Sequence, residues 1–267
     1  MSKIENSAGD FVIEKRENNT IWIFSINNPP ANTLSVKILD DLAQSLDSFL
    51  MAAEAKVLIL TGSGERAFCA GANINEIAAI KNPEQGVELA RKGQRLCDKI
   101  ENSDKPIIVA INGLCLGGGN ELAMACHLRI ASERAKFGQP EITIGIIPGF
   151  GGTQRLPKII GASRARKMIL TGDIISAQDA YEIGLVDEIV KEGMAVEKAV
   201  EVAKRILKNS FKMVQLSQKA IRDGLSLTLE QGLDRELKYF FEVCKSQDMK
   251  EGLAAFKEKR QAKYGDK

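Results

Sequence analysis

The sequence contains a single histidine, His127, and this scarcity excludes much catalytic chemistry. Zinc centres with several histidine ligands are excluded, and a Ser-His-Asp triad would have to use this one residue. The Gly-x-Ser-x-Gly motif of serine hydrolases is absent as well. Because His127 stands beside the strand-like segment 128–131, we interpret it as a structural residue, and we expect no metal site.

The five cysteines are scattered, and none forms a Cys-x-x-Cys pair. An odd number at irregular spacing argues for reduced thiols, and we expect all five to pack in the interior. No apolar run approaches eighteen residues, and the first residues lack an apolar secretion segment. We therefore expect a cytoplasmic protein without a membrane span.

Charge gives no strong indication of a partner, because 37 basic and 35 acidic residues are interspersed and leave a net charge of +2. Bulk attraction to nucleic acid or to a membrane surface is therefore not expected. The length of 267 residues permits one large domain, or one domain with a small appendage.

Apolar patterning predicts strands that alternate with helices, which is typical of an α/β core. Strands are expected at 11–15, 21–26, 57–61, 107–112, 128–131 and 185–190, and helices at 35–53, 86–102, 120–126, 163–170 and 176–183. The segment 62–73 is expected to be a loop. From 196 to 263 the pattern is continuously helical, so we expect a core domain over 1–195 and a helical oligomerisation region over 196–267.

The triple glycine 117–119 stands directly before a predicted helix. Glycines there leave unpaired backbone N–H groups at a helix N-terminus, which favours an oxyanion, although a plain tight turn is the simpler interpretation. Neither a P-loop motif nor a complete Gly-x-Gly-x-x-Gly fingerprint is present. A second N–H donor from the small residues around Gly71 would complete an oxyanion hole.

Two glutamates lie in apolar segments close to these glycines. Glu121 is in the first turn of the predicted helix and precedes 122–125, and Glu141 precedes the apolar run 142–147. A buried carboxylate has a free-energy cost, so its presence needs a reason. We expect their pKa values to be separated, with one group acting as the acid and the other as the base.

These residues belong to an ordered set of motifs at 68–74, 112–124, 137–155, 170–172, 184–186 and 256–260. Through this set, from about Asn27 to Tyr264, the chain resembles the crotonase superfamily and most closely its enoyl-CoA hydratases. The resemblance implies a spiral of ββα turns with a helical C-terminal trimerisation region. It also implies a homo-hexamer made of two trimers.

The resemblance further implies an acyl-CoA thioester substrate and reversible addition of water to a 2-enoyl-CoA, which gives 3-hydroxyacyl-CoA. It assigns catalysis to Glu121 and Glu141, the oxyanion hole to the N–H groups of Ala72 and Gly118, and water positioning to Gly149. No cofactor is implied beyond the CoA of the substrate. The residues that match substrate or CoA contacts are Ala70, Ala72, Asn73, Ile74, Asn75, Gly118, Phe240, Phe256 and Lys259.

Two departures from the family pattern concern CoA binding. Asn73 replaces an acidic residue, and the early loop 28–32 is one residue shorter and lacks the usual lysine. The resemblance also leaves alternatives open on the same scaffold: double-bond isomerisation, thioester hydrolysis, or hydration of a cyclic dienoyl-CoA. The presence of both glutamates favours hydration and argues against a catalytically silent scaffold.

An RNA-binding family member is the alternative outside enzymology, because some members of this family bind RNA through a lysine-rich helix. Arg91, Arg95 and Lys99 recur every four residues, with Lys92 beside them. A solvated helix face balanced by neighbouring acids is the simpler interpretation, and no aromatic residues interleave for base stacking.

Overall fold

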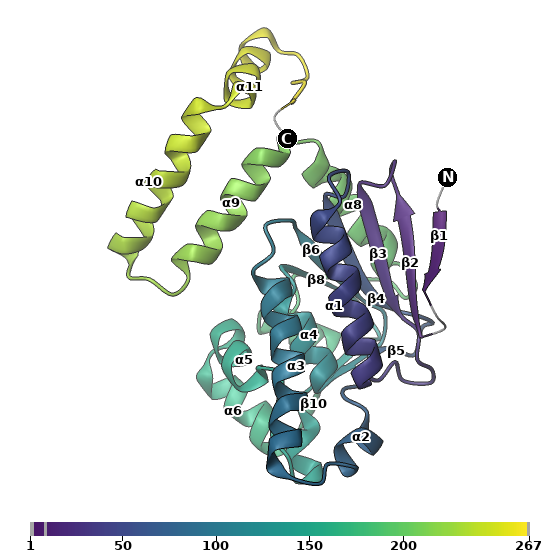
Figure 1. Cartoon of the computed structure of the whole chain (residues 1–267). Helices are drawn as coiled ribbons and strands as arrows, with labels where there is room; N and C mark the ends of the chain where they lie inside the picture. Colours follow the sequence, from purple (N-terminus) through teal and green to yellow (C-terminus); the bar gives the residue numbers. More distant parts are fainter. Residues whose placement is uncertain (1–2, 8–9, 266–267) are drawn as a thin grey trace. The chain divides into compact units, whose positions relative to one another are not determined.

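Figure 1 presents the computed structural model, which describes residues 3–7 and 10–265. The chain forms two compact units. The first comprises Met1–Ser103 and Ile107–Val200, and the second comprises Asp104–Pro106 and Glu201–Lys267. The division therefore falls inside helix α8 (Ala195–Leu207), whereas the sequence-based division was placed at residue 196, close to the start of that helix.

A seven-stranded sheet forms the centre of the first unit. The antiparallel strands at one edge continue into a parallel series of strands. Across the sheet the order is β1 (Lys3–Ser7), β2 (Phe11–Arg16), β3 (Ile21–Ile26), β4 (Val57–Gly62), β6 (Ile107–Ile111), β8 (Leu128–Ser132) and β11 (Glu188–Val190). Every residue of β4 and β6 is buried, as predicted from their unbroken apolar runs.

A second sheet has four short strands in the order β10 (Ile174–Ser176), β9 (Lys136–Gly138), β7 (Leu114–Leu116) and β5 (Ala67–Cys69). Strands of three residues are too short to give an alternating pattern, and β5 lies where a loop was expected. The strands β5, β7 and β9 follow β4, β6 and β8 in turn. Each turn of the chain thus adds one strand to each sheet before its helix, which is the predicted ββα spiral.

Helices α1 (Val36–Met51) and α3 (Pro83–Glu101) lie side by side over the large sheet (Figure 1). Ser35 caps α1 as predicted, and its side chain accepts from the N–H of Ile38. Asn82 caps α3, and Pro83 occupies its first turn, so this helix begins three residues before the predicted start.

The remaining helices of the first unit are short. They are α2 (Ile74–Ala78), α4 (Gly118–Ala125), the 3₁₀ helix η1 (Pro140–Ile144), α5 (Gly152–Ile160), α6 (Ala162–Thr171) and α7 (Ala177–Glu182). Helices α6 and α7 lie where the sequence predicted them, whereas α2, η1 and α5 were not predicted. The strand expected at 185–190 forms only over β11, because Leu185 and Val186 donate their N–H groups to the end of α7.

In the second unit, α8 is followed by α9 (Phe211–Gly224), α10 (Leu229–Lys245) and α11 (Gln247–Glu258). The helical prediction is confirmed up to Glu258 and wrong beyond it, because Lys259 adopts a left-handed conformation (φ 53°) that ends α11. Many large apolar side chains of this unit are exposed in the single chain, namely Ile221, Leu225, Leu227, Leu229, Leu233, Leu237, Phe240, Phe241, Leu253 and Phe256.

His127 has the structural role expected from the sequence. Its Nδ1 accepts from the N–H of Ile107 at 3.0 Å, and burial lowers the pKa of the ring. The expectation that every cysteine would be buried is wrong for Cys244, which is exposed on α10, and right for the other four. Among the residues that the structure describes, no helix combines the length and apolar character that a membrane crossing requires.

Candidate active site

The triple glycine allows helix α4 to begin inside the protein. Gly117 precedes the helix with a positive φ of 50°, and Gly118 is its first residue, two positions earlier than predicted. Gly119 packs directly against the backbone of Cys69, where a Cβ atom would clash with the carbonyl oxygen. All eight residues of α4 are buried, so Glu121 in its first turn is held in the interior, with 1% of its surface exposed.

The carboxylate of Glu121 is bound by the loop that leads into α5. Its Oε1 accepts from the N–H of Phe150 at 2.8 Å and from the N–H of Gly152 at 2.5 Å. A Cβ atom on Gly152 would lie 2.9 Å from this oxygen, so only glycine lets the backbone come this close. Two backbone donors therefore fix one oxygen of Glu121.

Glu141 lies on the other side of the triple glycine, in the first turn of η1. Its Oε1 is so close to Gly117 that a Cβ atom there would be 3.0 Å away. Gln139 is fully buried, and in the orientation that satisfies its amide it donates to both carboxylate oxygens of Glu141, at 2.9 and 3.1 Å. Gln139 was not predicted from the sequence as a site residue, although an amide two positions before a candidate acid is a signal for it.

Both carboxyl groups bind protons more tightly than ordinary glutamates. Burial raises the pKa of Glu121 to about 7, opposed by the N–H donors of Gly152 and Phe150 and by the charge of Arg155. Burial also raises the pKa of Glu141 to about 7, and the negative charge of Glu121 contributes to this shift. For the more deeply buried group, hydrogen bonds from backbone donors oppose the effect of its greater desolvation. The expected separation of the two pKa values stays a prediction.

Two backbone N–H groups face the space beside these acids. Leu34 donates to the carbonyl of Gly71 and accepts from the N–H of Asn73, so the N–H of Ala72 between them points the opposite way. A Cβ atom on Gly118 would lie 3.4 Å from the nitrogen of Ala72, which places the two groups side by side. Within the described part of the chain, neither N–H has a hydrogen-bond acceptor.

These groups line one cavity of about 420 Å³. Of the residues predicted from the sequence, it brings together Ala70, Ala72, Ile74, Gly118, Glu121, Glu141 and Gly149. Its other walls are mainly apolar and include Ile77, Ile80, Leu89, Ala90, Ile146 and Phe150, which the sequence analysis did not single out. The isoleucines at 74, 77 and 80 recur at helical spacing, and this pattern could have indicated an apolar wall.

The other predicted contact residues lie outside this lining. Asn73 caps α2, with its side chain accepting from the N–H of Asn75 at 3.0 Å. Phe240, Phe256 and Lys259 belong to the second unit, where both phenylalanines are exposed and Lys259 ends α11. Their predicted contacts with substrate or CoA stay predictions.

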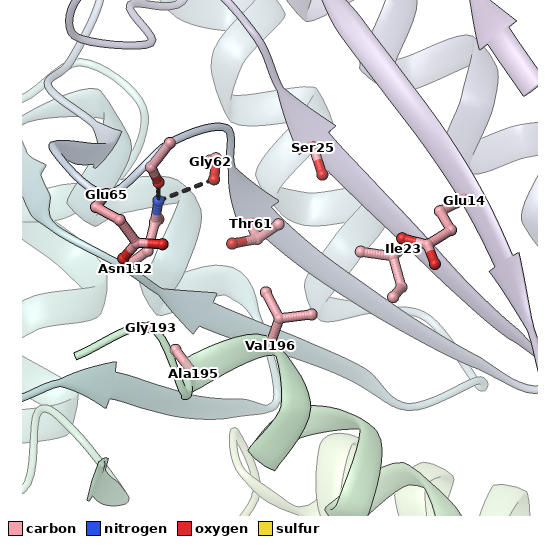
Figure 2. Close-up of a pocket in the computed structure, with 11 residues that line it drawn as sticks. Glu14, Ile23, Ser25, Thr61, Gly62, Glu65, Asn112, Gly193, Ala195 and Val196 are labelled. Atoms are coloured by element: carbon pink, nitrogen blue, oxygen red, sulfur yellow. Dashed lines mark hydrogen bonds between the residues drawn. The ribbon is translucent and has the colours of Figure 1, made fainter. Parts of the chain in front are cut away.

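A second, smaller cavity of about 190 Å³ lies elsewhere in the first unit, where β3, β4 and β6 end near the start of α8. Figure 2 shows Asn112 there, donating through its amide to the carbonyl of Gly62 at 2.9 Å and to that of Gly64. Its Oδ1 is buried and has no partner among the described residues. We interpret Asn112 as a support for the end of β4, since neither catalytic candidate lines this cavity.

Comparison with known proteins assigns the family. Residues 16–267 match the family described as enoyl-CoA hydratase/isomerase. The chain belongs to this family. A probable enoyl-CoA hydratase of Bacillus subtilis is 43% identical over 91% of this chain and 95% of its own length. A crotonyl-CoA hydratase of Syntrophomonas wolfei is 38% identical, over 96% of this chain and 97% of its own.

The solved structures agree with this assignment. The crystal structure of an enoyl-CoA hydratase from Bacillus anthracis superimposes with a TM-score of 0.91 and 42% sequence identity, over 96% of this chain and 98% of that one. The crotonase fold predicted from the motifs is therefore confirmed, including its helical C-terminal region.

The basic residues on α3 are balanced by acids. Lys92 and Lys99 pair with Asp40 and Asp47 of α1, each at 2.7 Å. Arg91 and Arg95 both pair with Glu88, at 3.3 and 3.5 Å. This neutralised face favours the solvated-surface interpretation over RNA binding.

Proposed function

We propose that this chain catalyses the reversible addition of water to the 2,3-double bond of a 2-enoyl-CoA thioester, which gives 3-hydroxyacyl-CoA. The family assignment and the names of its relatives support this reaction. The observation that carries the proposal is the convergence of Glu121 and Glu141 on the cavity that also contains the adjoining backbone at Ala72 and Gly118.

In the proposed reaction the thioester oxygen accepts hydrogen bonds from the N–H groups of Ala72 and Gly118. These donors polarise the carbonyl and draw electron density away from C3, which makes that carbon open to attack. They are fixed before the substrate arrives, so little reorganisation is needed when charge develops on the oxygen. In other enzymes such a donor contributes about 3–4 kcal/mol to lowering the barrier.

The two glutamates hold one water molecule in the proposed mechanism. The water oxygen forms a bond to C3 as the π bond between C2 and C3 opens. The ionised carboxylate takes a proton from the water, and the protonated carboxyl group delivers its proton to C2. With both pKa values near 7, a state with one ionised and one protonated carboxyl group is accessible at neutral pH. The side-chain amide of Gln94 donates to the carbonyl of Gly149 at 2.9 Å. We assign the backbone N–H of Gly149 to positioning the water.

Binding of the CoA part is assigned to Ala70, Asn73, Ile74 and Asn75, whose segment borders the cavity. The acyl pocket and CoA would also be contacted by Phe240, Phe256 and Lys259, in part from a neighbouring subunit. The reaction needs no cofactor beyond the CoA of the substrate.

We further propose that the chain assembles into a homo-hexamer of two trimers. Isolated soluble chains rarely leave so many large apolar side chains exposed as the second unit does. Light scattering on the purified protein would measure the mass of the assembly, and a monomer would contradict this proposal. We place the enzyme in the cytoplasm and in fatty-acid β-oxidation, in keeping with its reduced cysteines and with the reaction.

A direct assay tests the reaction. Purified protein mixed with crotonyl-CoA should remove the absorbance of the conjugated thioester, and a panel of straight, branched and cyclic enoyl-CoA esters should define the acyl group. Conversion of a 3-enoyl-CoA into a 2-enoyl-CoA without hydration would instead identify an isomerase. Turnover of none of these thioesters would contradict the proposed function.

A further inference from the structure

Arg155, in the first turn of α5, reaches back to the loop that binds Glu121. Its Nη1 donates to the carbonyl of Phe150 at 3.0 Å. The N–H of the same Phe150 donates to Glu121. The guanidinium covers Gly151 so closely that a Cβ atom there would clash with Nη1. Gly151, which lies between the two residues that donate to Glu121, also has a φ of 112°, a conformation that favours glycine.

The other side of the guanidinium is anchored to α3. Nε and Nη2 donate to one carboxylate oxygen of Glu101 at 3.0 and 2.8 Å, and Nη2 also donates to Asp98 at 2.6 Å. Only 11% of the arginine side chain is exposed. Four hydrogen bonds from a rigid, planar group thus connect the loop 149–152 to a long helix, a task that the flexible ammonium of lysine performs poorly.

We propose that Arg155 is a positioning residue for Glu121, which fixes the loop 149–152 to α3 so that the N–H groups of Phe150 and Gly152 hold the carboxylate in place for catalysis. Arg155 does not line the cavity, so it acts through the loop rather than on the substrate. This inference rests on the proposed hydratase function.

The charge of Arg155 adds an electrostatic effect to this mechanical one. The charged and titratable groups around Glu121 are Glu141 from η1, Cys97, Asp98 and Glu101 from α3, Cys126 at the end of α4, and Arg155 from α5. Arg155 is the cation among them, and it lowers the pKa of Glu121 against the effect of burial. Its removal should therefore raise the pKa of this group.

Three variants separate position from charge. Arg155→Met removes the hydrogen bonds and the charge. Arg155→Lys keeps the charge but removes the planar guanidinium with its several N–H donors. Glu101→Gln keeps the arginine but weakens its hydrogen bonds to α3. Arg95→Met is the matched control, because it removes an exposed arginine of α3 that pairs only with Glu88 among the described residues. The measurements are kcat, KM and the pH profile of kcat/KM for crotonyl-CoA, with thermal unfolding to monitor folding.

We expect Arg155→Met and Arg155→Lys to lower kcat on the order of tenfold to a hundredfold, with KM within about threefold of the wild type, since small misplacement of a catalytic group has such effects. In Arg155→Met the part of the kcat/KM profile that reports the ionisation of Glu121 should also move to higher pH. In Arg155→Lys and Glu101→Gln it should stay in place. Arg95→Met should leave all three measurements unchanged.

Unchanged kcat and an unchanged pH limb in folded Arg155 variants would overturn the inference. If Arg155→Met fails to fold, Arg155→Lys and Glu101→Gln decide: a lower kcat at constant KM supports positioning, and wild-type kcat in both contradicts it. Failure of the proposed function is distinguishable, because the wild-type protein itself would then show no hydration of crotonyl-CoA.

Discussion

Burial raises the pKa of both glutamates of the cavity to about 7, although their surroundings differ. Glu121 lies in a fully buried helix, and two backbone donors of a loop fixed by Arg155 bind it. Glu141 lies in a short 3₁₀ helix without a buried residue, and the side-chain amide of Gln139 binds it. At Glu121, N–H donors oppose the rise in pKa that deep burial causes. At Glu141, burial is shallower, and the negative charge of Glu121 adds to the rise in pKa. Backbone donors thus hold Glu121 inside the protein, whereas a side-chain amide holds Glu141 in a less buried turn.

Removal of either acid should have the largest effect. We expect Glu121→Gln and Glu141→Gln each to lower kcat for hydration at least about a hundredfold, because general acid–base help contributes that much. Binding of CoA should persist, because glutamine keeps the shape of the side chain. Steady-state kinetics with crotonyl-CoA and a CoA binding titration provide the measurements. Retained turnover in both variants would remove the assignment of the glutamates.

The sequence predicted the long elements of the fold because their patterns are long. The buried strands β4 and β6 and the capped helix α1 carry unambiguous apolar spacing. The three-residue strands of the second sheet were missed, since pairing with neighbours distant in the sequence creates them rather than any local pattern. The ββα spiral itself came from the resemblance.

For the site, the sequence could supply residue types but not the interactions that tune them. It indicated Glu121 and Glu141, and their meeting in one cavity is a matter of topology. It could not show that backbone donors oppose the effect of burial on the pKa of Glu121. Gln139 and Arg155 escaped notice because their partners lie across the fold or depend on the geometry of a turn.

The loop that holds Glu121 can be disturbed without replacing either glutamate. In Gly152→Ala the new Cβ would lie 2.9 Å from Oε1 of Glu121 and 3.0 Å from Gln139 and Pro148, so the loop must move. We expect kcat to fall on the order of tenfold to fiftyfold. Gly224→Ala is the control, since its Cβ would meet no atom within 4 Å. Wild-type kcat in Gly152→Ala would show that Glu121 does not depend on this loop.

The raised pKa values also predict how stability depends on pH. The folded protein holds protons on these groups up to about pH 7, whereas an unfolded glutamate releases its proton near 4.5. The folded state therefore binds more protons between these values, and its free energy of unfolding falls as the pH rises from 4.5 to 7. For Glu121 the rise in pKa corresponds to a loss of about 3 kcal/mol in the free energy of unfolding between these pH values.

Urea unfolding at pH 5 and pH 8 measures this effect. Glu121→Gln should remove most of the pH dependence that Glu121 causes and so stabilise the protein at pH 8. Glu141→Gln should do so less, because Glu141 is more exposed. The exposed Glu54→Gln serves as the control and should change nothing. A wild-type protein that is more stable at pH 8 than at pH 5, with no difference in Glu121→Gln, would contradict the prediction.

The smallest expected effect concerns the turn that carries Glu141. Thr143 Oγ1 donates to the carbonyl of Pro140 at 2.7 Å and closes the turn of η1 that carries Glu141. Thr143→Val keeps the shape and removes this bond, at a cost of about 1 kcal/mol in unfolding free energy. Thr20→Val is a matched control, because Thr20 Oγ1 donates to the carbonyl three residues earlier over the same 2.7 Å. Both variants should lose similar stability, but only Thr143→Val should lower kcat, by roughly twofold to fivefold, since only that turn positions an acid. An equal kcat in both variants would show that catalysis does not depend on the hydrogen bond that closes this turn.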